Sequence, residues 1–295
     1  MNFKGKRLLL ICILLISASA MTLSADEKKT AIRFGHAYGE NSAVIFNKYS
    51  SLIHLLSREL DRKVVFVLTN TYEEMQKAYL NNDIDMGIIN AYSYINIMES
   101  SQLLPIAARV KGNDKNYTSL FIVRKDSSIT SIEELKDRVF AFGDPYSTSS
   151  FLVPMYHLDK LGINPDTYFK NILIIPKQDS IIYSVMNKTI DSGAVASFIF
   201  NEQDEELKNR FRVIFKSEPF PLGPFVVNRR IGEDLIEKTR NFLLALSETE
   251  EGRKALQQAD LDPFSLVEKS DYNWLKKIAE SGYKLKSQQA RQDKL

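Results

Sequence analysis

The chain has 295 residues, of which 44% are hydrophobic and 26% charged, a composition that can bury a sizeable core. Its 39 Lys and Arg nearly balance its 37 Asp and Glu, so it lacks the basic excess of nucleic-acid-binding proteins, and no nucleic-acid partner is expected. The single cysteine, Cys12, lies in an N-terminal apolar run, which excludes disulfides, a thiol nucleophile and thiolate metal ligands from the rest of the chain.

An export signal is expected over residues 1–25. Three cations within the first seven residues precede an apolar run at 8–16, which is too short to span a bilayer, and small residues follow it. Cleavage is expected after Ala20 or after Ala25. Cys12 lies inside the apolar run and not at its end, where a lipoprotein cysteine would lie, so no membrane anchor is expected. Without the signal's three cations the net charge of +2 becomes −1. The signal and the absence of a later segment of transmembrane length predict a soluble, exported protein.

In the first half of the chain, strand-like runs alternate with apolar residues at helical spacing. The expected elements are, in order, a strand at 31–37, a helix at 41–60, a strand at 63–69, a helix opened by the capping box Thr71-x-x-Glu74 and ending at Tyr79 or Leu80, and strands at 84–90, 104–110 and 117–125.

The second half continues the alternation. The expected elements are a short helix capped by Ser131 with Glu134, a strand at 138–142, a helix starting near Ser147, strands at 171–177, 192–197, 211–217 and 223–230, and a mainly helical segment over roughly the last 60 residues. Such alternation predicts an α/β protein with mostly parallel sheets covered by helices. If the chain forms two lobes, the best candidates for the strands that cross between them are 119–125 and 217–226.

The most informative segment is AFGDPYSTSSFLVP, residues 141–154. A strand ends in a turn, and Ser147, Thr148 and Ser149 then open a helix. A helix N-terminus offers free N–H groups and a positive dipole, so this point can bind an anion without a basic side chain. A helix needs one capping hydroxyl and this one has three, although an ordinary cap remains the alternative. Pro154 would kink a helix that starts at Ser147, so the cap position is uncertain by two residues.

Other candidate site residues follow the predicted strands. Tyr72 comes just after the helix cap at Thr71, and Tyr117 opens the first crossing candidate, so both phenols could face a cleft. Half-buried tyrosines without a ligand are the alternative reading. Gln178 and Asp179 directly follow the strand at 171–177, where a ligand contact and a helix cap by Asp179 are both plausible.

Catalytic and metal-binding patterns are not found in the sequence. The three histidines have no partner at metal-ligand spacing, and no known nucleophile, phosphate-loop or dinucleotide motif occurs. His54 and His157 fall on predicted helices, where packing or surface positions are expected. We therefore expect no metal, no cofactor and no enzymatic activity.

Taken together, these segments resemble a known family, the periplasmic substrate-binding proteins of phosphate, phosphite and phosphonate ABC transporters. The resemblance extends from about residue 32 to the helices near Trp274. Its most specific block is GDPYSTSSFLVP at 143–154. The supporting blocks are NDIDMGIINAYSYI (82–95), YTSLFIVRKDSSITSIEELK (117–136), NKTIDSGAV (187–195) and SEPFPLGPFVV (217–227).

The resemblance implies a type II periplasmic binding protein fold, an α/β fold of two lobes that close on a ligand in the cleft between them. By resemblance, lobe 1 spans 26–120 plus 226–295 and lobe 2 spans 121–225. It also implies that oxyanion oxygens are bound by the residues that match the family's ligand-binding positions, namely Ser147, Thr148, Ser149, Tyr72 and Tyr117.

Three positions depart from the family pattern. Gln178 stands where the family has a ligand-binding histidine; its amide can donate a hydrogen bond but cannot become a cation. Gly223 stands where some members have an acid that holds a ligand amine, which makes an aminophosphonate an unexpected ligand. Ser150 replaces a usual glycine and is expected to narrow the approach to the helix start.

The resemblance implies a monomeric binding protein that captures a small phosphonate-, phosphite- or phosphate-like oxyanion and delivers it to an ABC transporter permease. One alternative is a sensing subunit that presents its ligand-bound form to a membrane sensor kinase. A second is a binding protein whose pocket has changed to another small ligand, as the Gln178 difference suggests. An enzyme is a third, against which the missing nucleophile argues.

Overall fold

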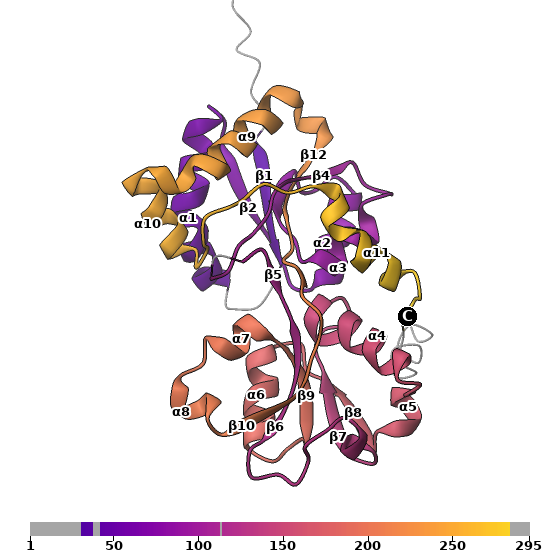
Figure 1. Cartoon of the computed structure of the whole chain (residues 1–295). Coiled ribbons are helices and arrows are strands. Elements are labelled where there is room, and N and C mark those ends of the chain that lie inside the picture. Colours follow the sequence, from indigo (N-terminus) through magenta and orange to yellow (C-terminus); the bar gives the residue numbers. More distant parts are fainter. Residues whose placement is uncertain (1–30, 38–41, 113, 284–295) are drawn as a thin grey trace, which may run out of the picture. The chain divides into compact units, whose positions relative to one another are not determined.

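The computed structural model describes residues 31–283 apart from 38–41 and 113 (Figure 1). The predicted signal segment at 1–25 lies outside the described residues. Among the helices that the structure describes, none is both long enough and apolar enough to cross a membrane.

Sheet 1 is five-stranded within the described part of the chain. Its spatial order is β2 (Val64–Thr69), β1 (Ile32–Ala37), β3 (Met86–Ile88), β12 (Phe225–Asn228) and β4 (Leu103–Ala107). β1 is parallel to β2 and β3, while β12 is antiparallel to both β3 and β4. Strands β1 to β4 therefore all run in one direction, and their carboxyl ends meet at one edge of the sheet.

Sheet 2 is also five-stranded. Its order is β10 (Phe211–Lys216), β6 (Ser119–Arg124), β9 (Ser192–Ala196), β7 (Val139–Phe142) and β8 (Asn171–Ile174). β7 is parallel to β8 and β9, β6 is antiparallel to β9, and β10 is antiparallel to β6. The prediction of an α/β protein with mostly parallel sheets is confirmed, because four of the five described strands in each sheet run in one direction. Strands β6 and β12 are antiparallel because each enters its sheet from the other one.

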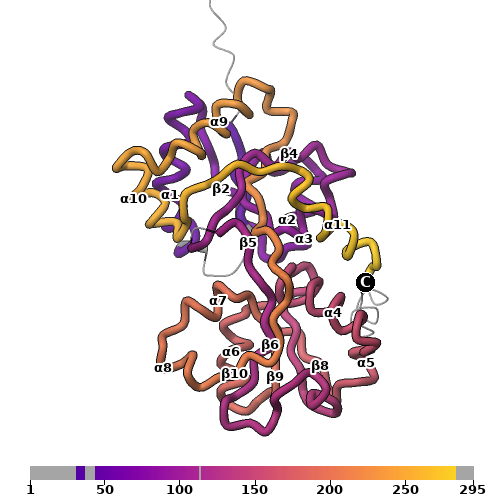
Figure 2. The backbone as a smooth tube through the Cα atoms, viewed as in Figure 1, coloured from indigo at the N-terminus to yellow at the C-terminus, as the bar shows by residue number. Residues whose placement is uncertain are grey.

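The two passages between the sheets lie side by side. β5 (Asn116–Tyr117) leads into sheet 2 and β11 (Phe220–Pro221) leads back, and the two pair antiparallel, with Phe220 opposite Tyr117. Figure 2 shows the outgoing and returning segments running together. Leu222 N also donates to Lys115 O at 2.9 Å. The predicted crossing at 217–226 contains β11, whereas the outgoing passage is β5, just before the predicted 119–125, most of which forms β6 of sheet 2.

Helices surround both sheets (Figure 1). Those associated with sheet 1 are α1 (Ser42–Glu59), α2 (Tyr72–Leu80), α3 (Ala91–Ile97), α9 (Glu233–Ala245), α10 (Glu250–Gln258) and α11 (Asn273–Ala279). Those associated with sheet 2 are α4 (Val153–Lys160), α5 (Pro165–Tyr168), α6 (Gln178–Met186), α7 (Ser197–Asn201) and α8 (Glu205–Lys208). The mainly helical C-terminal segment predicted from the sequence is thus confirmed by α9, α10 and α11.

Local signals explain where two of these elements begin. Thr71 Oγ1 accepts the N–H of Glu74 at 3.0 Å, so the predicted cap of α2 is confirmed. The predicted capping by Ser131 is wrong: Glu134 Oε2 instead accepts the N–H of Thr130 at 2.6 Å, one residue earlier, before the short 3₁₀ turn Glu133–Leu135. Either hydroxyl residue suits this turn, and the sequence pattern does not distinguish them.

Apolar packing is continuous through the crossings. One buried cluster runs from α2, α3 and the C-terminal helix through Phe220 to Phe121 and Phe140 of sheet 2. Trp274, on α11, lies 5.7 Å from the Tyr156 ring of α4 and 6.2 Å from the Phe220 ring. The C-terminal helix therefore packs on both the returning segment and a helix of sheet 2.

A buried carboxylate joins three strands at the amino edge of sheet 1. Asp85 has an 8% exposed side chain and accepts Arg33 N at 2.8 Å and Arg33 Nε at 3.0 Å, and it also pairs with Arg230. Its backbone bonds to Arg33 O and to Asn228 N. These contacts hold β1, β3 and β12 together at the edge of sheet 1 opposite the carboxyl ends of β1 to β4.

We expect Asp85→Ala to lower the free energy of unfolding by about 3 kcal/mol, because removing one partner leaves two guanidinium groups uncompensated. Chemical denaturation measures the change. Glu250→Gln, which breaks an exposed pair with Lys254, is the matched control and should cost less than about 0.5 kcal/mol. A loss no larger than the control's would contradict this role of Asp85.

Candidate functional site

The carboxyl edge of sheet 1 gathers polar side chains from three strands. Tyr72 follows β2, Asn90 follows β3 and Arg109 follows β4. Because these strands run in the same direction, all three residues leave the sheet at one edge. The backbone folds this way because each strand is a short apolar run, buried or half-buried, that is followed by a polar or capping residue.

Sheet 2 presents a matching edge. The segment 143–149 follows β7, and Gln178 follows β8 after the short loop at 175–177. β7 and β8 are parallel, so both segments leave the same edge. Tyr117 lies at the crossing, just before β6 enters this sheet at that edge. All six residues proposed from the sequence as ligand-binding therefore lie at the carboxyl edges or at the crossing.

The three-hydroxyl segment forms a wide helix start. Ser147 Oγ accepts Ser150 N at 3.3 Å, and Leu152 N donates to Ser147 O five residues back at 3.0 Å. This is a π-type turn over Thr148–Leu152, and regular helix α4 begins only at Val153. Pro154 therefore lies in the first turn of α4, where it is tolerated. The expected kink is avoided, and Ser147 is the cap residue.

The hydroxyls of this segment are withdrawn from bulk water. Ser147, Thr148 and Ser149 are 6%, 1% and 2% exposed. Thr148 Oγ1 accepts the N–H of Tyr92 at 2.9 Å and lies 3.3 Å from Asn90 Oδ1, to which it donates. The hydroxyl segment following β7 is thus bonded to the segment following β3 in the other sheet.

Ser150 does not have the position that we expected. Its fully buried hydroxyl donates to Ser147 Oγ at 2.7 Å, and the space over Gly143 holds it, since a Cβ on Gly143 would lie 1.9 Å from Ser150 Oγ. The hydroxyl is directed at the cap residue and the preceding turn. It supports Ser147, and the expectation of crowding at the helix start finds no support in these contacts.

The amide of Gln178 has a fixed orientation. Oε1 accepts the N–H of Ala196 at 2.6 Å, and Nε2 lies 3.5 Å from Ser149 Oγ. Since a backbone N–H can only donate, Oε1 must be the atom that faces it, and the NH₂ group is directed at the hydroxyl segment. Asp179 makes no helix cap; its carboxylate accepts from Gln203 Nε2 at 3.2 Å.

The two tyrosines are linked electrostatically to each other, and Tyr117 also lies near the hydroxyl segment. The Tyr117 phenol lies close enough to the Ser149 and Thr148 hydroxyls for them to lower its pKa against the effect of burial, and its ring packs 4.4 Å from that of Phe220. Burial raises the pKa of Tyr117 well above its usual value. Burial, reinforced by the Asp144 carboxylate, raises the pKa of Tyr72 to about 12. Both phenols therefore remain protonated and able to donate at neutral pH.

Two charged groups near these phenols were missed by the sequence reasoning. Asp144, in the Gly-Asp-Pro turn, and Arg109, two residues beyond β4, both act electrostatically on Tyr72. Asp144 was visible as part of the most informative segment, but we assigned it no role. For Arg109 the only signal was its place at the end of the predicted strand at 104–110, which does not reveal where a side chain points.

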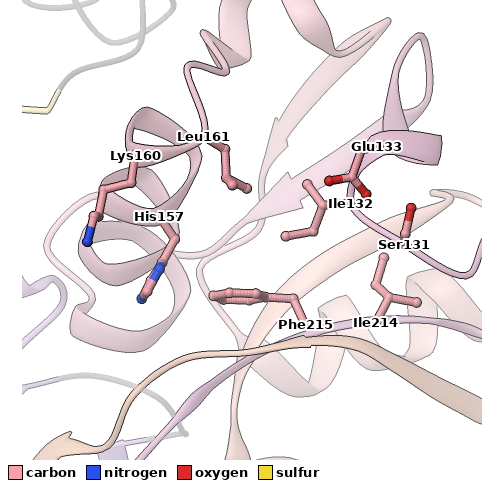
Figure 3. A pocket seen from close by; sticks show the side chains of 8 residues that line it. All are labelled: Ser131, Ile132, Glu133, His157, Lys160, Leu161, Ile214 and Phe215. Atoms are coloured by element: carbon pink, nitrogen blue, oxygen red, sulfur yellow. The ribbon is translucent and has the colours of Figure 1, made fainter.

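A separate pocket lies within the sheet 2 region. It measures about 480 Å³ and is lined by Ser131, Ile132, Glu133, His157, Lys160, Leu161, Ile214 and Phe215 (Figure 3). The His157 ring packs 4.9 Å from the Phe215 ring, and burial lowers the pKa of His157. The packing role predicted for His157 is therefore confirmed, and none of the six proposed ligand-binding residues lines this pocket. In the described residues, no group of three His, Cys, Asp or Glu could hold a metal ion.

Comparison with known proteins gives the family. The model of the family described as "ABC transporter, phosphonate, periplasmic substrate-binding protein" matches residues 34–272. The chain belongs to this family. Its members are substrate-binding proteins of transport systems, and membership implies a periplasmic location and a small ligand passed to a permease.

The names of this chain's relatives mention different ligands. The phosphonates-binding periplasmic protein of Escherichia coli is 25% identical over 249 residues, 81% of this chain and 73% of the relative. The phosphate-import protein PhnD of Mycolicibacterium smegmatis is 22% identical over 249 residues, 78% of each chain.

A solved structure shows the fold. PhnD1 from Prochlorococcus marinus, in complex with methylphosphonate, is 21% identical with a TM-score of 0.75, covering 88% of this chain and 100% of that one. The predicted type II periplasmic binding protein fold, with two α/β lobes each built on one sheet, is confirmed by this likeness.

Gly223 lies in close contact with the site's backbone. A Cβ at this position would lie 1.9 Å from Ile89 O and 2.5 Å from Asn90 Cα. Asn90 belongs to the segment that bonds to Thr148. An acidic side chain at Gly223 would therefore collide with the backbone after β3, which explains why this position has none.

We expect Asp144→Asn to raise the melting temperature at pH 7. Burial raises the pKa of Asp144 above its usual 3.8, and its recorded partner among the described residues is Tyr146 N, at 2.7 Å. The native state then binds the proton more tightly than the unfolded state, so this group's contribution to stability falls as the pH rises from about 4 through the native pKa.

Thermal melts from pH 4 to 8 test this. The variant should match the wild type near pH 4 and exceed it by ~2 °C at pH 7. Asp126→Asn is the control, because Arg124 lowers the pKa of that exposed carboxyl, and it should bring no gain. A pH-independent difference for Asp144→Asn would show that the carboxylate's burial is not the cause.

Proposed function

We propose that this protein captures a small oxyanion, a phosphonate, phosphite or phosphate-like anion, by closure of its two lobes and delivers it to an ABC transporter permease. The observation that carries the proposal is the buried hydroxyl segment at the start of α4, together with the phenols of Tyr117 and Tyr72, whose pKa values are raised by burial. A tetrahedral anion accepts hydrogen bonds only, and this group of residues is rich in donors. The ligands named for the relatives support the same chemistry.

The proposed lobes are 26–120 plus 226–295 for lobe 1 and 121–225 for lobe 2. Sheet membership supports boundaries within a few residues of these, since β6 of sheet 2 begins at Ser119 and β12 of sheet 1 begins at Phe225. The paired strands β5 and β11 serve as the hinge. The closed state is favoured only when a ligand contacts both lobes.

Each proposed ligand contact has a defined donor. Ser147, Thr148 and Ser149 contribute hydroxyls from lobe 2, with the Thr148 hydroxyl turning from Asn90 Oδ1 to the ligand, and the same helix start contributes backbone N–H groups. Tyr72 and Tyr117 contribute phenols, and Gln178 contributes its NH₂ group, which already points toward Ser149. All these groups come from one chain, which supports action as a monomer.

Calorimetric titration of the mature protein tests the proposal. Phosphate, phosphite, methylphosphonate, 2-aminoethylphosphonate and sulfate are titrated in turn, and at least one of the first three should bind with a micromolar or lower Kd. 2-Aminoethylphosphonate should bind more weakly than methylphosphonate, since Gly223 offers no partner for an amine. Binding weaker than millimolar by every anion would refute the oxyanion proposal.

We expect Thr148→Val to weaken binding of the preferred anion roughly 30-fold, about 2 kcal/mol. The methyl group removes a donor to the ligand and also leaves the Tyr92 N–H without its acceptor. Thr148→Ser keeps the hydroxyl and is the matched control, with a change of less than about threefold. Equal affinity of the valine variant and the parent would exclude Thr148 from the site.

We expect Gln178→His to strengthen binding of methylphosphonate about tenfold at pH 5.5, because a charged imidazole gives a stronger hydrogen bond than a neutral amide. The gain should disappear above about pH 7.5, where an ordinary imidazole is neutral. Gln203→His adds the same ring beyond α7 and should change nothing. A Gln178→His variant with no gain at any pH would argue that the histidine of the family is not replaced at this position.

A further inference from the structure

Arg109 is rigidly placed at the carboxyl edge of sheet 1. The preceding residue, Ala108, exchanges two backbone hydrogen bonds with Ser265, Ala108 N to Ser265 O at 2.8 Å and Ser265 N to Ala108 O at 3.0 Å. Two residues further on, Lys111 N bonds to Asp114 O at 2.9 Å. The base of the Arg109 side chain is therefore fixed at the start of the segment that leads from β4 to Tyr117.

The guanidinium of Arg109 is partly buried and lacks a counter-ion. Its Nε is buried with no hydrogen-bond partner, and among the described residues no carboxylate lies within ion-pair distance of it. Other partly buried cations of lobe 1 are paired, Arg33 with Asp85 and Lys111 with Glu202. A desolvated charge without a partner is costly, so such a group indicates that an anion is missing.

The field of Arg109 acts on the proposed site. Its positive charge opposes the burial that raises the pKa of Tyr72 and of Tyr117, and it acts on the buried Tyr272 as well. The charge of Arg109 thus acts on three phenols from separate segments. Two of them are proposed ligand donors, so the guanidinium lies within electrostatic range of the place where the anion is proposed to bind.

The remaining donors of the site are neutral. The hydroxyl segment, the phenols and the Gln178 amide contribute dipoles only, and the nearby formal charge of Asp144 is negative where it is ionised. A doubly charged oxyanion that binds among these groups would lose its hydration and gain no positively charged partner in return. Arg109 is the group at this edge that can supply one, and its planar fork matches two oxygens of a phosphonate or phosphate.

We propose that Arg109 is the counter-ion of the bound oxyanion and makes the site selective for doubly charged tetrahedral anions over singly charged ones. This inference rests on the proposed function. The resemblance implies that a lobe 2 histidine can provide positive charge in the family, and here we assign that charge to Arg109 in lobe 1. The charge is permanent, because an arginine is not deprotonated in proteins.

The test uses Arg109→Gln and Arg109→Lys in the mature protein, with methylphosphonate and inorganic phosphate as dianionic probes and methylsulfonate as the monoanionic probe. Arg229→Gln is the matched control. It removes the same charge from the same lobe, but Arg229 follows β12 at the opposite edge of sheet 1 and is exposed. Affinities are measured by calorimetry at low and high salt, and melting temperatures without ligand by circular dichroism.

We expect Arg109→Gln to weaken binding of the dianion at least 30-fold and of the monoanion less than fivefold, with a smaller salt dependence of affinity. Arg109→Lys should recover part of the loss, and Arg229→Gln should stay within threefold of the parent. The ligand-free melting temperature of Arg109→Gln should be unchanged or higher, because an uncompensated cation is removed.

The outcomes separate this inference from the proposed function. A parent protein that binds none of the anions refutes both. A parent that binds phosphonate while Arg109→Gln binds it equally well refutes only the counter-ion role. A ligand-free Arg109→Gln that melts well below the parent, or an equal loss for dianion and monoanion, would assign Arg109 a structural role and overturn the inference.

Discussion

The chain passes between its two sheets twice, and the pairing of those two passages is the constraint on which the site depends. β5 and β11 bond to each other, so the strands that they feed, β6 and β12, must enter sheets 2 and 1 from the opposite direction to their neighbours. Both sheets then direct the carboxyl ends of their parallel strands toward the crossing. Tyr117 lies on β5, and Gly223 comes two residues after β11. The proposed site therefore lies next to the crossing and not at the opposite edges of the two sheets.

Much of this arrangement follows from local sequence. The alternation of short apolar runs with capped helices predicts the order of strands and helices, since each signal, such as Thr71 before α2, acts over a few residues. The sequence also predicts the hydroxyl segment at the start of α4, because strand, turn and hydroxyls are contiguous. Resemblance to the family adds the two tyrosines and Gln178. Strands β6 and β12 run against the other four strands of their sheets, and this direction is set by long-range topology that no local pattern carries.

The parts that could not be predicted are contacts between distant segments. Nothing in the sequence pairs Thr148 with Tyr92, 56 positions away, or shows that Ser150 turns its hydroxyl toward Ser147 over Gly143. The wide π-type turn at Thr148–Leu152 allows both the Ser147 cap and a proline in the first turn of α4. Helix propensities alone do not predict such a turn. In the sequence, Arg109 looks like any other arginine at the end of a strand. Only the folded structure shows that no carboxylate of the described residues pairs with it. Local rules therefore identify the donors of the site, and the folded chain is needed to identify its charge.

The sequence contains a single tryptophan, and its position has a practical consequence. The Trp274 indole contacts Tyr156 on a helix of lobe 2 and Phe220 on the returning passage, while its own helix belongs with sheet 1. Any rotation of one lobe against the other changes the surroundings of this ring. The protein thus contains its own optical reporter of hinge motion, and the emission of an unlabelled sample can be followed in real time while a solute is mixed in.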